Sequence, residues 1–174
     1  RIRELADNML ETMRAANGIG LAAQQVGEAL QLTVLDVSAV EDRPSTMAWN
    51  GREVNPKDHM PLIILNPRIE TGPEKEVASE GCLSFPEISA DIERAGWTKI
   101  EAQTLDGERV EIEATGLLAR ALQHEIDHLN GILFIDRMNS AAKASLSSKL
   151  KRLQKETQRG LTTSRRPRAV EPAL

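Results

Sequence analysis

The sequence predicts an α+β fold in which antiparallel strands surround a buried central helix, with a further helix near the C-terminus. Three observations predict this class. Apolar and charged residues alternate between positions 88 and 114, Asp106-Gly107 is a tight hairpin signal, and apolar residues recur at helical spacing at both ends of the chain. Helices placed before and after a run of antiparallel strands are typical of α+β proteins.

The length of 174 residues fits one domain with a sizeable core. Aromatic residues make up 2% of the chain, so the core must be built from aliphatic side chains. We expect a single domain over residues 1–159. Residues 160–174 are rich in Thr, Arg and Pro, and we expect them to form a disordered tail.

Charge and composition narrow the class of partner. The formal net charge is -4 and no dense basic block lies within the predicted domain, which argues against specific nucleic-acid binding. No apolar run approaches the roughly 18 residues needed to span a membrane. Cys82 is the single cysteine and cannot form an internal disulfide, which favours a reducing cytoplasm. Arg1 already stands in a helical pattern, so we expect that an N-terminal segment of the domain is missing.

The N-terminal half is predicted to contain one helix and two strands. The helix is indicated by five apolar residues at helical spacing, Ile2, Leu5, Met9, Leu10 and Met13. Asn17-Gly18 ends it, and a loop of small residues follows to Gly27. Apolar runs at 32–37 and 62–65 predict strands, the second stopped by Asn66-Pro67. The proline-containing stretch between them, 40–61, reads as an irregular excursion.

The C-terminal half is predicted to hold more strands and two helices. Residues 74–83 are expected to be extended, and 88–114 to form antiparallel strands that turn at Asp106-Gly107. Thr115-Gly116 opens a helix that Asn130-Gly131 ends. A last amphipathic helix is expected over 141–158.

The strongest chemical signal lies on the helix after Gly116. His124 and His128 stand four residues apart, so one helical face presents both imidazoles to a common point. Leu117 and Ala121 occupy the same face, which indicates that it points inward. A single histidine on such a face is usually a satisfied core residue. Two of them, with Glu125 able to take a proton from a water between them, favour a metal site.

A catalytic metal site usually has three protein ligands and one open position. His59 lies in the proline-containing excursion and reads as a surface residue. Cys82 follows Gly81, which permits a close backbone approach, yet a free cysteine is most often a small buried apolar residue. The residues alone leave both interpretations of Cys82 open. A thiolate with two imidazoles would suit Fe(II), Zn(II), Co(II) or Ni(II).

Three segments in this order resemble the motifs of the peptide deformylase family. Residues 18–25, GIGLAAQQ, are similar to the family's Gly-x-Gly-Leu-Ala-Ala-x-Gln. Residues 80–84, EGCLS, are similar to its Glu-Gly-Cys-Leu-Ser. Residues 123–128, QHEIDH, are similar to its Gln-His-Glu-x-Asp-His. The combination is far more specific than any of the three, and the similarity extends from the first helix to at least Phe134.

The resemblance implies an enzyme that removes the formyl group from the N-terminal methionine of new polypeptides. It implies one divalent metal ion, Fe(II) first, with Zn(II), Ni(II) or Co(II) as alternatives. The implied metal ligands are Cys82, His124 and His128, and Glu125 is the implied proton carrier. The Gln25 side-chain amide and the Leu83 backbone N–H are the implied donors to the transition state.

The resemblance also implies the substrate contacts. Peptide main-chain contacts fall on Ile19 and Gly20, and the methionine pocket on Ile19, Leu117 and Ala121. Some family members bind the peptide with an arginine seven residues after the motif cysteine. Ser89 stands there in this chain, so that contact is not assigned.

Arg94 matches a family arginine, and we expect it to pair with Glu80. This pair would orient a metal ligand from behind.

Three competing interpretations remain open. A metallopeptidase of the His-Glu-x-x-His type would need a downstream ligand, for which Asp136 and Glu156 are the candidates. A non-catalytic metal-binding relative is a second. The basic residues of the last helix and tail could contact the ribosome transiently, although a solvated helix face is the favoured interpretation of them. The expected location is the cytoplasm, of a bacterium first and of an organelle second.

Overall fold

The computed structural model describes residues 1–164 of the chain, with side chains to residue 161. Its described residues divide into two compact units, Arg1–Met138 and a second that begins at Asn139. The single domain predicted over 1–159 stays a prediction, since the first unit ends at Met138. No helix among the described residues has the length and apolar character needed to cross a membrane.

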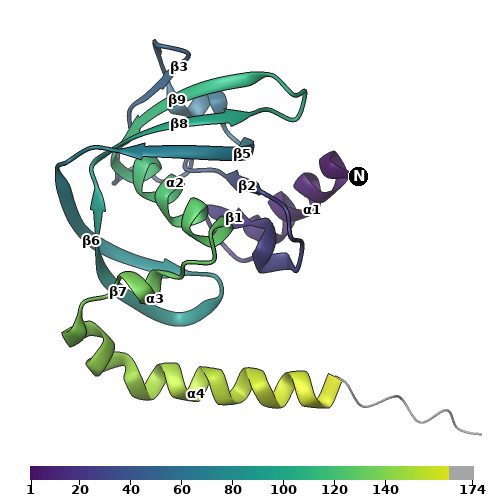
Figure 1. Cartoon of the computed structure of the whole chain (residues 1–174), viewed down its shortest axis with the longest axis vertical. Coiled ribbons are helices and arrows are strands. Elements are labelled where there is room, and N and C mark those ends of the chain that lie inside the picture. Colours follow the sequence, from purple (N-terminus) through teal and green to yellow (C-terminus); the bar gives the residue numbers. More distant parts are fainter. Residues whose placement is uncertain (165–174) are drawn as a thin grey trace, which may run out of the picture. The chain divides into compact units, whose positions relative to one another are not determined.

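The first unit is built on antiparallel strands (Figure 1). Seven of them form one sheet in the order β1 (Gly20–Ala22), β2 (Leu32–Leu35), β5 (Leu62–Thr71), β8 (Trp97–Gln103), β9 (Arg109–Thr115), β3 (Met47–Trp49) and β4 (Arg52–Val54). A separate two-stranded ribbon pairs β6 (Lys75–Cys82) with β7 (Phe85–Ala95). The predicted α+β class is confirmed.

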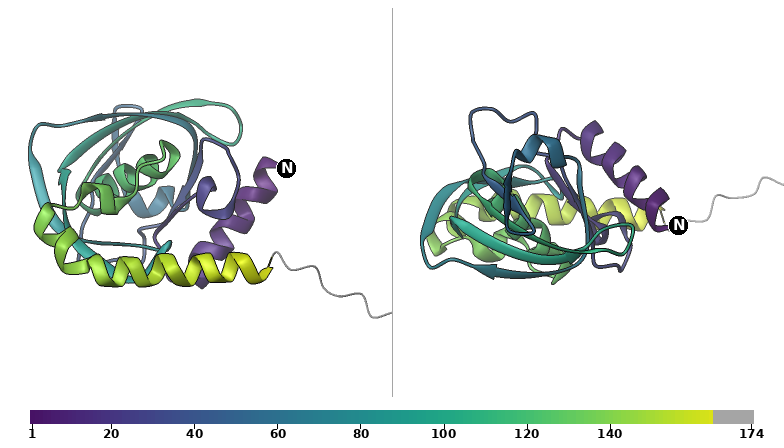
Figure 2. Two further views of the ribbon diagram at one scale, coloured as in Figure 1. Left: turned by 60° about the horizontal axis from the view of Figure 1, so that its bottom comes forward. Right: turned by 90° about the horizontal axis from the view of Figure 1, so that it is seen from above.

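The helix α2 (Gly116–Leu129) lies within the curve of the large sheet (Figure 2). Every residue from Leu117 to Leu129 is buried. Alternation along the strands explains the packing, because Ile100 and Ile112 point to the helix while Glu101 and Glu111 point away. Leu118, Leu122 and Ile126 complete this core from the helix side.

The helix α1 (Ile2–Ala15) packs on a second apolar cluster. Successive residues of β2 divide between the two clusters: Leu32 and Val34 meet α1, whereas Leu35 belongs to the core around α2. The strand is buried on both faces for this reason. One short strand therefore joins the first helix to the helix that carries the histidines.

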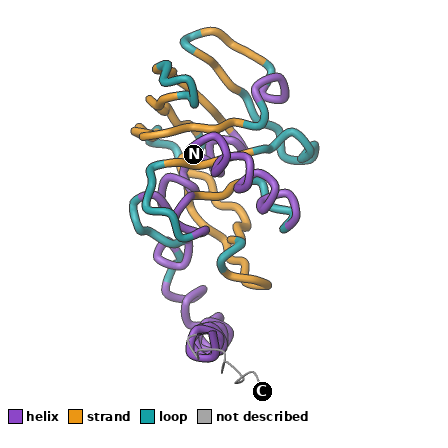
Figure 3. Tube along the Cα trace, turned by 90° about the vertical axis from the view of Figure 1, so that its right-hand side faces the viewer, coloured by secondary structure: helices purple, strands orange, loops and turns teal. Residues whose placement is uncertain are grey.

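The proline-containing stretch from 40 to 61 is more regular than the sequence indicated. It contains β3 and β4, which extend the sheet beyond β9, and then the 3-10 turn η2 (Pro56–His59). Figure 3 shows the strand hairpin followed by this turn. The predicted irregular excursion was wrong because three-residue strands are too short to show a period.

Other boundaries differ from the predicted ones. Strand β5 does not stop at Asn66-Pro67 but passes it through a register shift between Leu65 and Arg68. The small-residue loop after Gly18 contains β1 and the 3-10 turn η1 (Ala23–Val26). A one-turn helix, α3 (Phe134–Arg137), follows α2 and was not predicted.

The described part of the second unit is one helix, α4 (Ser140–Ser164). The predicted helix over 141–158 is confirmed and is longer than expected at its C-terminal end. Residues 160–164, predicted to belong to the tail, continue the helix. The remainder of the predicted tail, 165–174, lies outside the described residues.

Candidate metal centre

A thiol and two imidazoles converge beside α2. His124 and His128 are one helical turn apart, and their Nε2 atoms are 3.1 Å from each other. The Cys82 Sγ lies 3.3 Å from the His128 Nε2. One ligand atom from each residue falls within 4.8 Å of the other two. His59 is not in this group; its ring stacks on Trp49 at 5.0 Å.

The end of the β6–β7 ribbon brings Cys82 to the helix. The pairing of the two strands shifts between Gly81 and Cys82, so that Cys82 stands opposite Phe85 at the tight end of the hairpin. This irregularity turns the half-buried sulfur toward α2. The Ser84 backbone N–H donates a hydrogen bond to the sulfur and favours its thiolate form.

The surroundings of these donors favour positive charge between them. Burial raises the pKa of the Cys82 thiol, but hydrogen bonds from His124 and His128 outweigh it and lower the pKa to about 6. Burial lowers the pKa of His124, but contacts with Cys82 and Glu80 outweigh it and raise the pKa to about 10. A site that stabilises a proton between these side chains also stabilises a metal cation. Thiolate and imidazole are ligands that Fe(II), Zn(II), Ni(II) and Co(II) accept. The donor set therefore fits one divalent ion.

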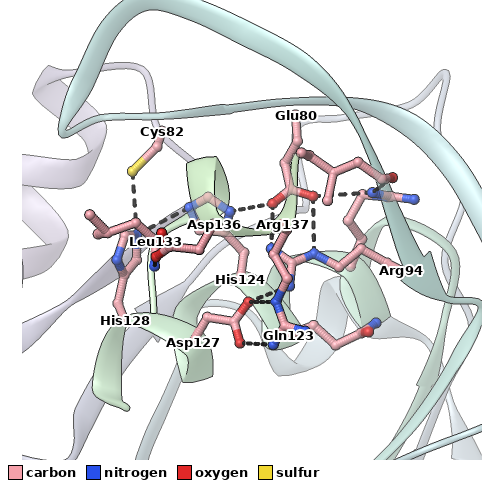
Figure 4. A network of polar contacts seen from close by, with 12 residues as sticks. Glu80, Cys82, Arg94, Gln123, His124, Asp127, His128, Leu133, Asp136 and Arg137 are labelled. Atoms are coloured by element: carbon pink, nitrogen blue, oxygen red, sulfur yellow. Dashed lines mark hydrogen bonds and ion pairs between the residues drawn. The ribbon is translucent and has the colours of Figure 1, made fainter. Parts of the chain in front are cut away.

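Glu80 lies behind His124 and is held by three cationic or polar partners (Figure 4). Its Oε1 is 2.5 Å from the His124 Nδ1 and 2.6 Å from the Arg94 Nη2. Its Oε2 accepts hydrogen bonds from the Arg94 Nε and the Arg120 Nη1, each at 3.1 Å. Because Glu80 accepts the Nδ1–H of His124, the neutral form of this imidazole, which is the form that binds a metal, keeps its lone pair on Nε2, facing Cys82 and His128.

The ion pairs fix the charge of Glu80. Burial raises the pKa of this carboxyl, but the contacts with His124 and Arg94 outweigh it and lower the pKa to about 2. The expected pairing of Arg94 with Glu80 is present. Arg120, one turn before His124 on α2, was not singled out from the sequence, although a buried arginine among apolar helix residues could have signalled a partner.

Two further residues of α2 face the same ribbon. Asp127 pairs with Arg94 and with Arg137 of α3. The Gln123 side chain accepts from the Ala95 backbone N–H at 3.0 Å and donates to the Ala95 carbonyl at 2.9 Å. These contacts fix α2 against β7. No pattern in the sequence pointed to Arg137.

Glu125 lies on another flank of the helix, against the chain near Gly20. Its carboxyl is buried and the Oε2 has no hydrogen-bond partner. Burial raises the pKa of Glu125 to about 7, despite the opposing effect of His124 and His128. Gly20 permits this placement, because a Cβ at that position would lie 2.7 Å from the Glu125 Cδ.

The amide of Gln25 is held in a defined orientation. Its Oε1 accepts the Ala22 backbone N–H at 2.9 Å. Its Nε2 then points to the Ser84 hydroxyl at 3.0 Å, with the Cys82 Sγ 3.7 Å away. Ser84 lay within the second sequence motif, but its contact with Gln25 was not anticipated.

A cavity of about 710 Å³ opens onto this cluster. Most of the residues singled out from the sequence line it: Ile19, Gly20, Gln25, Glu80, Cys82, Leu83, Leu117, Ala121, His124 and Glu125. His128 and Arg94 are buried and do not line it. Ser89, at the position of the missing family arginine, is on the wall. The cavity thus brings apolar wall residues and amide donors together with the Cys82 thiol and the His124 imidazole.

The amino-acid sequence is similar to those of known proteins. The family model described as polypeptide deformylase matches residues 1–144. The peptide deformylase of Methylacidiphilum infernorum is 41% identical over 155 residues, which are 89% of this chain and 81% of that protein. The peptide deformylase of Opitutus terrae is 43% identical over 158 residues, 90% of this chain and 82% of that protein.

Solved structures agree. Peptide deformylase 1B of Arabidopsis thaliana, determined with an inhibitor, has a TM-score of 0.75 and 36% identity, and the match covers 91% of this chain and 80% of that one. A peptide deformylase from Synechococcus elongatus in complex with actinonin has a TM-score of 0.71 and 38% identity, covering 85% and 74%. At these identities the likeness extends beyond the fold.

Proposed function

The chain belongs to the peptide deformylase family, and on that premise we propose how its own residues perform the reaction. It is a metal-dependent hydrolase that removes the formyl group from the N-terminal methionine of new polypeptides and releases formate. The observation that carries the assignment of residues is the convergence of one thiol and two imidazoles, of which the Cys82 thiol and the His124 imidazole line the cavity.

Cys82, His124 and His128 are the proposed metal ligands. Fe(II) is the proposed ion, with Zn(II), Ni(II) or Co(II) as substitutes, because a soft thiolate and two imidazoles suit each of them. When bound, the ion supplies Lewis acidity that makes water a nucleophile near neutral pH. Glu80 and Arg94 act behind the ligands: the carboxylate orients the His124 ring, and the guanidinium holds the carboxylate.

Glu125 is the proposed proton carrier. It lies beside His124, and its pKa, raised to about 7, allows it to take and to return a proton near neutral pH. It takes a proton from the attacking water and delivers it to the amine nitrogen of the departing peptide. The unpartnered Oε2 supports this role, because no competing hydrogen bond holds it.

Gln25 and Leu83 are the proposed donors to the formyl oxygen. Negative charge builds on this oxygen during attack, and the Gln25 Nε2–H and the Leu83 backbone N–H stabilise it. One such donor is typically worth roughly 10²- to 10³-fold in rate. Support comes from the fixed amide of Gln25, whose Oε1 is already occupied by the Ala22 N–H.

The substrate is proposed to bind along the cavity wall. Ile19 and Gly20 would contact the peptide main chain, and Ile19, Leu117 and Ala121 would surround the methionine side chain. The partners are therefore formylmethionyl nascent peptides. A cytoplasmic location, of a bacterium first and of an organelle second, is proposed from the bacterial relatives.

A transient ribosome contact is a weaker proposal. It rests on exposed basic residues of α4, which are Lys143, Lys149, Lys151, Arg152 and Lys155. Arg165, Arg166 and Arg168 lie outside the described residues. A solvated helix face explains the same residues, so truncation after Gly160 with ribosome co-sedimentation decides between the two.

The metallopeptidase alternative lacks support in the described residues. Asp136 caps its own helix, accepting the Leu133 backbone N–H at 2.9 Å, and it is not in the ligand group. Glu156 lies in the second unit, 3.8 Å from Arg152. A non-catalytic relative would not require Gln25 and Glu125 at the cavity, and both are there.

The test offers formyl-Met-Ala and an internally cleavable peptide to the anaerobically purified, metal-analysed protein. Formate release from the first alone is expected.

Glu125→Ala should keep the metal and lose roughly 10²- to 10⁴-fold in kcat, while Glu101→Ala, an exposed control on β8, should match the parent. Cys82→Ser should lower the metal content. Full activity of Glu125→Ala, or an unchanged metal content of Cys82→Ser, would remove that residue from its role.

A further inference from the structure

The short segment after α2 contacts both elements that carry the proposed ligands. The chain leaves α2 at Asn130, turns, and the Ile132 backbone N–H returns to the Asp127 carbonyl at 2.8 Å. One helical turn, α3, follows and places Phe134 in the interior, 1% exposed. Asp136 fixes the start of this turn through the Leu133 N–H. The segment is therefore anchored to the end of α2 by its backbone.

Phe134 fills the space between the ribbon and the helix. Its ring meets Phe85 of β7 edge-on, with centroids 5.3 Å apart, and lies 6.3 Å from the His124 ring at a tilt of 34°. Phe85 stands opposite Cys82 in the hairpin. One aromatic side chain thus packs beside both the thiol segment and the first imidazole.

Arg137 begins a chain of ion pairs that ends at His124 (Figure 4). Its Nη2 and Nε donate to the two Asp127 oxygens at 2.5 and 3.0 Å. Asp127 also receives the Arg94 Nη1, and Arg94 in turn holds Glu80. The Arg137 side chain is 45% exposed, whereas the Asp127 side chain is 9% exposed. A residue at the surface is thereby connected to a buried ligand.

The charges explain why this connection matters. Asp127 and Glu80 both form ion pairs with Arg94. Arg137 supplies Asp127 with a second cation, so Arg94 does not have to neutralise Asp127 by itself. Without Arg137, the guanidinium of Arg94 would move toward Asp127 and loosen its hold on Glu80. Glu80 would then orient the His124 imidazole less firmly.

Resting on the proposed ligand set, we infer that α3 is a clamp on the metal centre, in which Arg137 and Phe134 are positioning residues for His124. Neither residue lines the cavity, so Arg137 acts through Asp127, Arg94 and Glu80, and Phe134 acts through ring packing. The clamp sets how tightly the ion is held, not which bond is broken.

The test measures Co(II) affinity by chelator competition and the visible Co(II) spectrum. Arg137→Gln should weaken Co(II) binding roughly tenfold and shift the spectrum, as is typical for residues that orient a ligand. Arg137→Lys should fall between Gln and the parent, because an ammonium cannot bridge both carboxylate oxygens. Phe134→Leu should show a smaller loss. Arg3→Gln, which breaks an exposed ion pair with Asp106, is the matched control and should bind like the parent.

A double-mutant cycle checks the route. If Arg137 acts through Asp127, Arg137→Gln should cost much less in an Asp127→Asn background than in the parent. Folding is monitored by far-UV circular dichroism, and the Lys variant carries the test if the Gln variant fails to fold. Co(II) affinities of Arg137→Gln and Arg137→Lys within twofold of the parent overturn the clamp and leave the ligands in place. A parent chain that binds no Co(II) overturns both.

Discussion

Two buried glutamates on different flanks of the ligand helix have pKa values shifted in opposite directions. Glu80 faces the side where Arg94, Arg120 and His124 surround its oxygens, and its pKa is lowered to about 2. Glu125 faces the side of Gly20, where its Oε2 has no partner, and its pKa is raised to about 7. Burial raises the pKa of both, but only Glu80 has enough cationic and hydrogen-bonding partners to reverse the shift.

The difference assigns a task to each flank. A carboxylate whose charge is fixed by ion pairs orients its neighbour and does not exchange protons at neutral pH. A carboxyl whose pKa lies near 7 can hold or release a proton during a reaction. The flank with Glu80 is a support, and the flank with Glu125 is where a proton can move.

The substitution with the largest expected effect removes the carboxylate of Glu80. Glu80→Gln leaves the buried guanidinium of Arg120 without its carboxylate and that of Arg94 with Asp127 alone, which should cost about 3–5 kcal/mol in the free energy of unfolding. Glu76→Gln on the same strand removes an exposed carboxylate and should stay within about 0.5 kcal/mol of the parent. Urea unfolding of the metal-free proteins measures both. Equal stabilities for the two variants would contradict the distinction between the flanks.

The pH dependence of stability should separate the two glutamates. The folded pKa of Glu125 lies above its model value of 4.5, so the folded protein keeps a proton that the unfolded chain releases, and stability falls as pH rises from 4.5 to 7. This loss should be about 3 kcal/mol in the metal-free parent and absent in Glu125→Gln. For Glu80 the sign reverses, since its stabilisation is present above pH 4.5 and is lost as pH falls through about 2.

Measuring this requires unfolding curves of parent and Glu125→Gln at several pH values between 4.5 and 7.5. Other groups titrate in that window, so the informative quantity is the difference between the two proteins. A difference that stays constant with pH would show that Glu125 titrates like a solvated carboxyl.

The helix with its two histidines could be predicted from the sequence because fourteen residues give a clear period and the turn signals stand at both ends. The strands from 88 to 114 were predictable for a similar reason, since Glu111 and Glu113 alternate with apolar neighbours. Cys82 could not be brought to the histidines by pattern alone. Its position depends on a hairpin irregularity between Gly81 and Cys82, and only the resemblance to a family pointed to it.

The features that could not be predicted from the sequence are very short elements and contacts between residues far apart in the chain. The helix α3 has four residues, fewer than any periodic pattern needs, and Arg137 meets Asp127 only because that turn folds back. The hydrogen bond between Gln25 and Ser84 joins residues 59 positions apart. Such contacts follow from the tertiary fold, so they cannot be predicted from local sequence propensity.

The smallest of the three effects sharpens the comparison on the flank of Glu125. Gly20 has no need of glycine for its own backbone conformation, since its φ is not positive. It is required there by the Glu125 carboxyl, which an added Cβ would meet at 2.7 Å from Cδ. Gly20→Ala should therefore displace the carboxyl rather than strain the strand. A displacement of about 1 Å in a reacting group costs roughly 10²-fold, equivalent to about 2.7 kcal/mol in the barrier.

Gly72→Ala is the matched control, because its added Cβ would make an ordinary contact with the Trp97 Cβ at 3.5 Å, and its kcat should match the parent. Gly20 is also proposed to contact the peptide main chain, so KM and kcat must be measured separately. A displaced Glu125 lowers kcat and leaves metal content unchanged, whereas a lost peptide contact alone raises KM. A Gly20→Ala protein with parental kcat would mean that the Glu125 carboxyl has room to move, and that its burial without a partner is not what prepares it for proton transfer.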